Sequence, residues 1–246
     1  RESQTEFALE RVRARTMAMK KSDELPETSH ILFEQMKELG EPVEQLTIGI
    51  VQEENNVIEI SATLHGDTLK KIYLHSIDEP YMMTKVYKAW KTQQKTLIVE
   101  LKGDELNSYN KYRNELTNSE MFPTNLGDEH RRIVYAAFFS KGMLALGANE
   151  PRPTQSLQLL ERFASVFDLT YTRFLDLQKA EAQAREAQIE LGLERVRART
   201  MAMQKSDELQ DAAILLFQQM NVLGVQTGSC GFNIWNKDEK AANVWM

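Results

Sequence analysis

Cysteine and long apolar runs are scarce in this sequence. A single cysteine, Cys230, stands among 246 residues, which excludes an internal disulfide framework and favours a reducing compartment. The longest apolar run, residues 133–139, is far shorter than the roughly 20 residues that a membrane helix needs. The first residues do not form a signal peptide either. We therefore expect a cytoplasmic protein with no membrane segment in this sequence.

Motifs that carry catalysis or bind metals are also missing. The sequence has no GxxxxGK[ST] or GxGxxG phosphate loop and no nucleophile elbow, so ATP-dependent and triad chemistry lack support. None of the histidines forms an HxxH or HExxH pair, which argues against a metal site; they are His30, His65, His75 and His130. We predict no enzyme activity, with a dispersed active site as the alternative. The cofactor remains unknown.

The sequence contains a long internal repeat. Residues 9–25 and 193–209 differ only at Lys20 and Gln204, and a weaker match continues from residues 31–40 to residues 215–224. The offset, 193 − 9 = 184 residues, is far longer than the roughly 20 to 50 residues of a solenoid repeat. We expect one whole domain-sized unit and the start of a second, cut from a longer tandem array.

The first copy of the repeat has the composition of a helix. Leu9, Val12, Thr16 and Met19 follow 3-4 spacing, which predicts a narrow seam of coiled-coil type. Pro26 then limits the helix, so we expect a kink or restart at residues 22–26. The next helix stops at Gly40, a residue typical of helix ends.

Alternating apolar residues and turn residues predict an antiparallel sheet in the middle of the chain. The predicted strands cover residues 46–52, 57–64, 71–77, 96–101, 132–139 and 143–146, with helices at 80–93 and 104–118. In the second repeat copy, Cys230 aligns with Leu46. This alignment predicts a buried, structural thiol on a strand.

Residues 154–221 contain one glycine and no proline, and they predict one long helix. Its narrow stripe must be buried, either against a second copy in a parallel dimer or against its own sheet. We favour the dimer from Leu177 onward, while the part up to Phe174 can do both. The predicted dimer contacts along both long helices are Leu9, Val12, Met19, Phe167, Phe174, Leu177, Leu193, Val196 and Met203.

Arginines recur in both repeat copies, at Arg11, Arg13 and Arg15 and again 184 residues later. Nucleic-acid binding is one interpretation, but these residues spread round the helix and have glutamate neighbours. The formal net charge of −6 also argues against generic phosphate binding. We therefore favour solvent-exposed or interhelical salt-bridging roles and expect no nucleic-acid partner.

Three segments resemble the GAF family of bacterial sensory domains. They are EPYMMTKVYKAWKTQQKTLIVEL (residues 79–101), GMLALGANEPRP (residues 142–153) and the exit helix from residue 159. The resemblance implies an α+β fold with a GAF-like antiparallel sheet flanked by helices and long N- and C-terminal coiled-coil helices. We divide the chain into a connector (1–25), a GAF-like sensory domain (26–176), a signalling helix (177–224) and the truncated start of a second domain (225–246).

The resemblance also implies a function and a site. It predicts a non-catalytic sensory and dimerisation module, of the sensor histidine kinase type, that relays a ligand-induced change through a parallel coiled coil. A ligand would lie between the sheet and the middle helices, near Tyr73, His75, Tyr81, Trp90, His130 and Tyr135. The alternatives are a structural dimerising spacer without a ligand and a nucleic-acid-associated regulator.

The unpaired edges of the last hairpin should pair with another chain or sheet edge.

Overall fold

The computed structural model describes residues 2–64, 67–68, 72–235 and 242–245. The chain forms two compact units, Arg1–Leu175 and Asp176–Met246, which we call unit 1 and unit 2. The predicted α+β class is confirmed, because an antiparallel sheet in unit 1 carries helices on both faces. In the part of the chain that the structure describes, no helix combines the length and the apolar character needed to cross a membrane.

A seven-stranded sheet forms the centre of unit 1. Its strands follow the order β3-β2-β1-β7-β6-β5, and β4 also pairs with β2. They are β1 (Gln45–Gln52), β2 (Val57–Leu64), β3 (Asp67–Thr68), β4 (Tyr73–Ser76), β5 (Thr96–Lys102), β6 (Arg131–Phe139) and β7 (Gly142–Ala148). The six predicted strands all occur. The strand expected at residues 71–77 is shortened to β4, and Lys71 lies outside the described residues.

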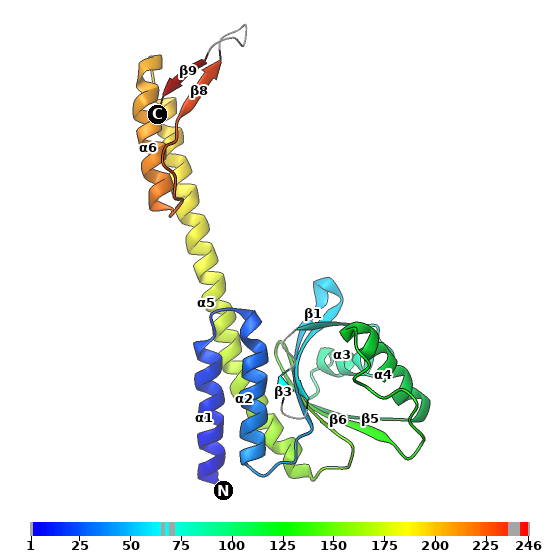
Figure 1. Cartoon of the computed structure of the whole chain (residues 1–246). Coiled ribbons are helices and arrows are strands. Elements are labelled where there is room, and N and C mark those ends of the chain that lie inside the picture. Colours follow the sequence, from blue (N-terminus) through cyan, green and yellow to red (C-terminus); the bar gives the residue numbers. More distant parts are fainter. Residues whose placement is uncertain (1, 65–66, 69–71, 236–241, 246) are drawn as a thin grey trace. The chain divides into compact units, whose positions relative to one another are not determined.

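Both faces of this sheet are covered by helices (Figure 1). On one face lie α1 (Glu2–Ala18), α2 (Leu25–Glu38) and the first part of α5 (Thr154–Met201); on the other lie α3 (Met83–Lys91) and α4 (Gly103–Thr117). Successive side chains of a strand point to opposite faces. On β6, Tyr135 therefore belongs to the core under the long helices, and Ala136 belongs to the core under α3 and α4.

The helix expected at residues 80–93 begins later, at Met83. The buried Glu79 carboxylate accepts hydrogen bonds from the backbone N–H groups of Tyr81, Met82 and Met83, at 2.9, 2.8 and 2.8 Å. A carboxylate at this place satisfies N–H groups that lack a partner in the first helical turn. Glu79 is therefore a structural residue that anchors α3.

Five of the predicted dimer contacts lie in the intrachain core of unit 1 instead. Leu9, Val12, Met19, Phe167 and Phe174 are all at least 94% buried. They pack with fully buried side chains of α2, α5 and the sheet, among them Leu32, Met36 and Phe163. The 3-4 spacing had the right period. It did not distinguish a partner helix in the same chain from one in a second copy, because both bury the same stripe.

Unit 2 repeats the first part of unit 1 in three dimensions. The turn η3 (Ser206–Glu208) and helix α6 (Leu209–Val222) follow η1 (Ser22–Glu24) and α2 at offsets of 206 − 22 = 184 and 209 − 25 = 184 residues. The prediction of one helix over residues 154–221 is wrong, because α5 ends at Met201 and α6 packs back along it. Gly192 of α5 lies against Gln219 and Leu223.

A glutamate caps the turn at this break in both copies. The Glu208 carboxylate accepts hydrogen bonds from the backbone N–H groups of Gln204 and Lys205 at 3.1 and 3.2 Å. Glu24 does the same for Lys20 and Lys21 at 2.9 and 3.1 Å. Pro26, the expected cause of the break, has no counterpart in the second copy, where Gln210 stands. The glutamate contact is therefore common to both breaks, whereas the proline is not.

The repeated arginines stabilise the same turn. Arg15 pairs with Glu24 and Glu27 at 3.1 and 2.6 Å. Arg199 pairs with Glu208 and Asp211 at 3.4 and 2.6 Å. The predicted interhelical salt-bridging role is thus confirmed for the third arginine of each copy.

The end of the described chain is a short hairpin, β8 (Phe232–Trp235) paired with β9 (Ala242–Trp245). Ile234, Trp235 and Val244 are exposed. Within the described residues neither strand pairs with a third, so the expected pairing with another chain or sheet edge stays a prediction. Cys230 precedes β8 and is half-buried, so the predicted strand position of this thiol is wrong.

The capping glutamates allow a test of what ends α1. Replacing Glu24 by Ala should lower the free energy of unfolding, because it removes the acceptor of two backbone N–H groups and the partner of Arg15. It should also speed hydrogen exchange at the amides of Lys20 and Lys21. Urea denaturation and exchange mass spectrometry measure the two effects. The control Pro26→Ala should leave exchange at these amides slow. Faster exchange in the proline variant alone would show that the proline, and not the glutamate, causes the break.

Candidate functional site

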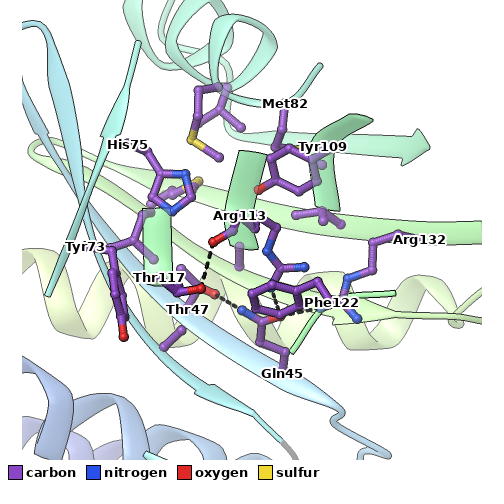
Figure 2. A pocket seen from close by; sticks show the side chains of 18 residues that line it. Gln45, Thr47, Tyr73, His75, Met82, Tyr109, Arg113, Thr117, Phe122 and Arg132 are labelled. Carbon is purple, nitrogen blue, oxygen red and sulfur yellow. Dashed lines mark hydrogen bonds between the residues drawn. The ribbon is translucent and has the colours of Figure 1, made fainter. Parts of the chain in front are cut away.

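A cavity lies in unit 1 between the sheet and helices α3 and α4 (Figure 2). Its volume is about 60 Å³, which is room for roughly four water molecules. One part of its wall is apolar, formed mainly by Ile60, Met82, Met83, Val86, Val134 and Met143. The other part is polar and comes from β1, β4, α4 and β6.

Helix α4 contributes one of its faces to the cavity. Tyr109, Arg113 and Thr117 line it at spacings of four residues, and such positions lie on the same side of a helix. Burial raises the pKa of Tyr109 to about 12, so its phenol keeps its proton at neutral pH. The helix that the sequence showed only as polar therefore has a defined inward stripe.

Asparagines on α4 hold the loop that follows it. The Asn114 side chain accepts a hydrogen bond from the Phe122 N–H at 2.9 Å and donates one to the Phe122 carbonyl at 2.7 Å. Asn107 makes the same pair of bonds with Leu126, both at 2.9 Å. This clamp places the Phe122 ring 3.4 Å from Cζ of Arg113, in a cation–π contact.

Arg113 is a buried cation without an acidic partner. Its Nη2 donates to Oε1 of Gln45 at 3.2 Å, and within the described residues it forms no ion pair with a carboxylate. Burial lowers the pKa of Arg113 to about 10, so the group is still charged at pH 7. Tyr109 and Phe122 face the guanidinium with their rings. Aromatic faces attract a cation but do not neutralise it.

Arg132 enters the same space from β6. Its Nη2 donates to the same Gln45 oxygen at 2.5 Å, and burial lowers the pKa of Arg132. Gly147, the neighbour of Gln45 on β7, makes room for the guanidinium, because a Cβ atom there would overlap Arg132 Nη2. A glycine inside a strand commonly marks such a close approach.

The site therefore carries excess positive charge. Two guanidinium groups share one neutral amide oxygen, that of Gln45. The neighbouring carboxylate, Glu44, lies 3.7 Å from Arg132 and 3.6 Å from Arg152, so two arginines share its single charge. Charges buried without full compensation are costly.

His75 on β4 is a further polar group of the cavity whose hydrogen bonding is incomplete. The residue is 94% buried, and within the described residues its Nδ1 atom has no hydrogen-bond partner. Its ring packs edge-on against Tyr112 with the centroids 5.5 Å apart. Burial, helped by the positive charge of Arg113, lowers the pKa of His75 to about 3. The imidazole is therefore neutral at pH 7, with one donor and one acceptor nitrogen.

An outer hollow of about 350 Å³ adjoins the cavity. Gln45, Arg113, Phe122 and Arg132 line both spaces. These four side chains thus form the wall between them, and the hollow is the natural approach to the two guanidinium groups.

The structure separates the residues predicted to contact a ligand. Tyr73 and His75 line the cavity. Tyr81 is half-buried and packs against the same core without lining the cavity. His130 is exposed at the outer hollow, where its Nδ1 lies 3.0 Å from Glu129. His65 lies outside the described residues.

Trp90 and Tyr135 lie elsewhere. The Trp90 indole N–H donates to the carbonyl oxygen of Phe139 at 3.1 Å, outside the cavity. Tyr135 faces the core on the opposite side of the sheet, and its hydroxyl accepts a hydrogen bond from the backbone N–H of Arg152 at 2.8 Å. The alternation of side chains along a strand explains the position of Tyr135. Even-numbered residues of β6, such as Arg132 and Val134, face the cavity, so the odd-numbered Tyr135 points to the other face.

Sequence reasoning missed Gln45, Arg113 and Arg132, the most polar part of the site. The sequence of β6 did contain a signal for Arg132. Arg132, Val134 and Ala136 are two residues apart and therefore point to the same, buried face of the sheet. An arginine in phase with buried residues is unusual, because arginine is almost never fully buried without a partner. The pairing of β1 with β7, which brings Gln45 beside Gly147, could not be read from these segments separately.

Comparison with known proteins gives similarity to solved structures only. No model of a protein family matches the chain, and no curated protein matches it. It is similar to the A. aeolicus nlh2 GAF domain in an inactive state, with a TM-score of 0.40 and 13% identity over 72% of this chain and 98% of that one. It is also similar to the GAF domain of an Acinetobacter phosphoenolpyruvate-protein phosphotransferase, with a TM-score of 0.42 and 11% identity over 68% and 91%.

The buried His75 predicts a pH dependence of stability. The folded state keeps His75 neutral down to about pH 3, whereas the unfolded chain protonates it below the ordinary histidine pKa of 6.5. Its contribution is therefore complete above pH 6.5 and is lost as the pH falls toward 3. Between pH 7 and pH 5 the loss is about 2 kcal/mol. Urea denaturation at both pH values should show a smaller loss in His75→Gln. The exposed His130→Gln serves as the control, and equal losses in the two variants would contradict the assignment.

Proposed function

We propose that unit 1 is a non-catalytic, GAF-like sensory domain that binds a small ligand in the cavity between the sheet and helices α3 and α4. The observation that carries this proposal is the set of unsatisfied polar groups in the cavity. Arg113 and Arg132 share one amide oxygen, and His75 Nδ1 has no partner among the described residues. Pockets with apolar walls and a few convergent polar groups are typical ligand sites.

The route by which such a ligand would act begins in α3 and ends in α5. Helix α3 forms part of the cavity wall, and its Trp90 is hydrogen-bonded to Phe139 on β6. The Phe139 ring packs 5.1 Å from Phe167 of α5, and the stack continues to Tyr171 and Phe174 at 5.3 and 5.8 Å. A shift of α3 on ligand binding would therefore press on an aromatic column along α5.

The ligand biases the helix if it binds one arrangement of this column more tightly than the other. Helix α5 continues without interruption to Met201, so a change in its unit 1 portion has a covalent path onward. We propose that the output lies in a further domain of the parent protein, such as a histidine kinase.

A second copy of the chain is the proposed partner of α5. Leu177, Ala180, Ala184, Ala187 and Leu191 are exposed and follow 3-4-3-4 spacing, the period of a coiled-coil seam. Leu177 and Leu191 are 56% and 53% exposed. This seam keeps Leu177 from the sequence prediction and uses Leu191 in place of Leu193.

The other predicted contacts fit this seam less well. Leu193 is 52% exposed, but it follows Leu177 by 16 residues and so lies about 160° round the helix from it. Val196 and Met203 are half-buried within unit 2. Helix α6 contacts α5 near them, through Arg195 and Gln219.

The alternative of nucleic-acid binding loses its main support, because most of the repeated arginines have acidic partners. Arg11, Arg13 and Arg15 pair with Glu38, Glu10 and Glu24. A dimerising spacer without a ligand would leave the charge excess in the cavity unexplained, so we favour the sensory function.

Dimerisation has a specific test. Replacing Leu177 and Leu191 together by Glu would bury charges in the seam, and we expect the chain to become monomeric in size-exclusion chromatography with light scattering. The control Leu193→Glu places the same charge on the other side of α5 and should leave the dimer intact. A wild-type chain that is monomeric at all concentrations would overturn this proposal.

Ligand binding is tested with a panel of anionic, neutral and cationic metabolites, read by the melting temperature of the full 246-residue chain. A true ligand present at about 100 times its dissociation constant should add about 2.7 kcal/mol to the stability. A variant with a filled cavity, Ala145→Leu, should lose the response. If no compound of any charge class shifts the melting temperature, the sensory proposal fails in favour of the structural spacer.

A further inference from the structure

We propose that the cavity of unit 1 recognises a small organic monocarboxylate of about three or four carbons that carries a hydroxyl or oxo group. The carboxylate would lie between Arg113 and Arg132, and the second polar group would bond to His75. This inference rests on the proposed ligand-binding function and specifies the chemistry of its site.

The charge of the ligand follows from the two guanidinium groups. Both now donate to one amide oxygen, Gln45 Oε1, at 3.2 and 2.5 Å. A carboxylate brings two oxygens and a full negative charge, and its planar geometry suits guanidinium donors. It would therefore take over the position of the Gln45 oxygen as acceptor and offset part of the charge of the two buried cations. A neutral or cationic ligand would leave that charge as it is.

The size of the ligand follows from the cavity. A volume of about 60 Å³ holds roughly four water molecules, which suits a molecule of few heavy atoms and excludes a nucleotide or tetrapyrrole. Met82, Val86 and Met143 belong to the apolar part of the cavity wall. An apolar carbon chain of this length would cover them. Methionine side chains adapt readily to small differences in shape.

The second polar group follows from His75. Its Nδ1 has no hydrogen-bond partner among the described residues and is shielded from solvent. A hydroxyl can donate to or accept from the neutral imidazole, and an oxo group can accept from it. Either group would satisfy a buried polar atom that is costly to leave without a partner. A simple fatty acid would leave the atom unsatisfied.

The residues along the path of entry favour an anionic ligand. The outer hollow reaches Arg113 and Arg132 from the other side of the wall, and Arg131 and His130 also line it. An incoming carboxylate therefore meets the guanidinium groups first. Phe122, clamped by Asn114, stands beside Arg113 at this boundary and would shield the bound carboxylate from water.

Isothermal titration calorimetry of the full chain at pH 7 tests the proposal with three probes of nearly equal shape. Lactate carries both polar groups, propionate lacks the hydroxyl, and lactamide lacks the charge. We expect lactate to bind, propionate to bind more weakly, and lactamide to bind not at all. The substitution H75F should reduce the preference for lactate over propionate.

The protein variants separate the role of charge from that of folding. Losing one charged hydrogen bond should weaken lactate binding about 10- to 100-fold, so R132M and R113M should both show this loss. The matched control R162M removes the same charge from α5 on the opposite face of the sheet, where Arg162 pairs with Glu2 and Glu6, and should bind lactate normally. If R132M fails to fold, G147A displaces the guanidinium without removing it and should weaken binding in the same way.

The outcomes distinguish this inference from the proposed function. Equal binding of lactamide and lactate, or unchanged lactate binding in both R132M and R113M, would overturn the carboxylate inference. So would a metabolite panel in which only neutral or cationic compounds stabilise the chain, although the sensory function would then stand. A panel in which nothing binds would overturn both.

Discussion

Burial of the sheet on both of its faces is the constraint on which unit 1 depends. Each central strand must supply apolar side chains in both directions, and β6 does so from Ile133 onward and β7 from Met143 onward. The core under α1, α2 and α5 is densely filled by Phe163, Phe167 and Leu32. The core under α3 and α4 is interrupted by arginine, glutamine and histidine, and the cavity lies there.

This asymmetry separates the face that stabilises unit 1 from the face that holds the proposed ligand site. The filled face holds the helices to the sheet, and each fully buried aliphatic or aromatic side chain contributes about 1.5–3 kcal/mol. The interrupted face costs stability, because Arg113 and Arg132 are desolvated cations with too few acceptors. Groups that lower stability in this way are common at functional sites, which supports the ligand site that we propose. Strands β1, β6 and β7 contribute side chains to both faces, so one face can influence the other through them.

The connector is a second theme of the structure. In each copy a helix ends at a glutamate-capped turn and a second helix packs back along the first, with Arg15 or Arg199 across the turn. In unit 1 the sheet and α5 pack against this pair of helices, and Leu9 is 5% exposed. In unit 2 the equivalent Leu193 is 52% exposed. Nearly identical sequence thus has different burial, because burial depends on what packs against it and not on the segment alone.

Local pattern was sufficient for most of the elements and for the repeat, but it missed the break between α5 and α6. The period of two predicted the strands, the 3-4 spacing predicted the helices, and the two copies of residues 9–25 predicted a recurring connector, since these features depend on near neighbours in the chain. Contacts between distant segments were decided by the tertiary structure. The pairing of β1 with β7 brings Gln45 to Gly147, and the packing of α4 brings Arg113 to the same oxygen as Arg132. These groups are 68 and 87 residues from Gln45, so their convergence is a property of the fold.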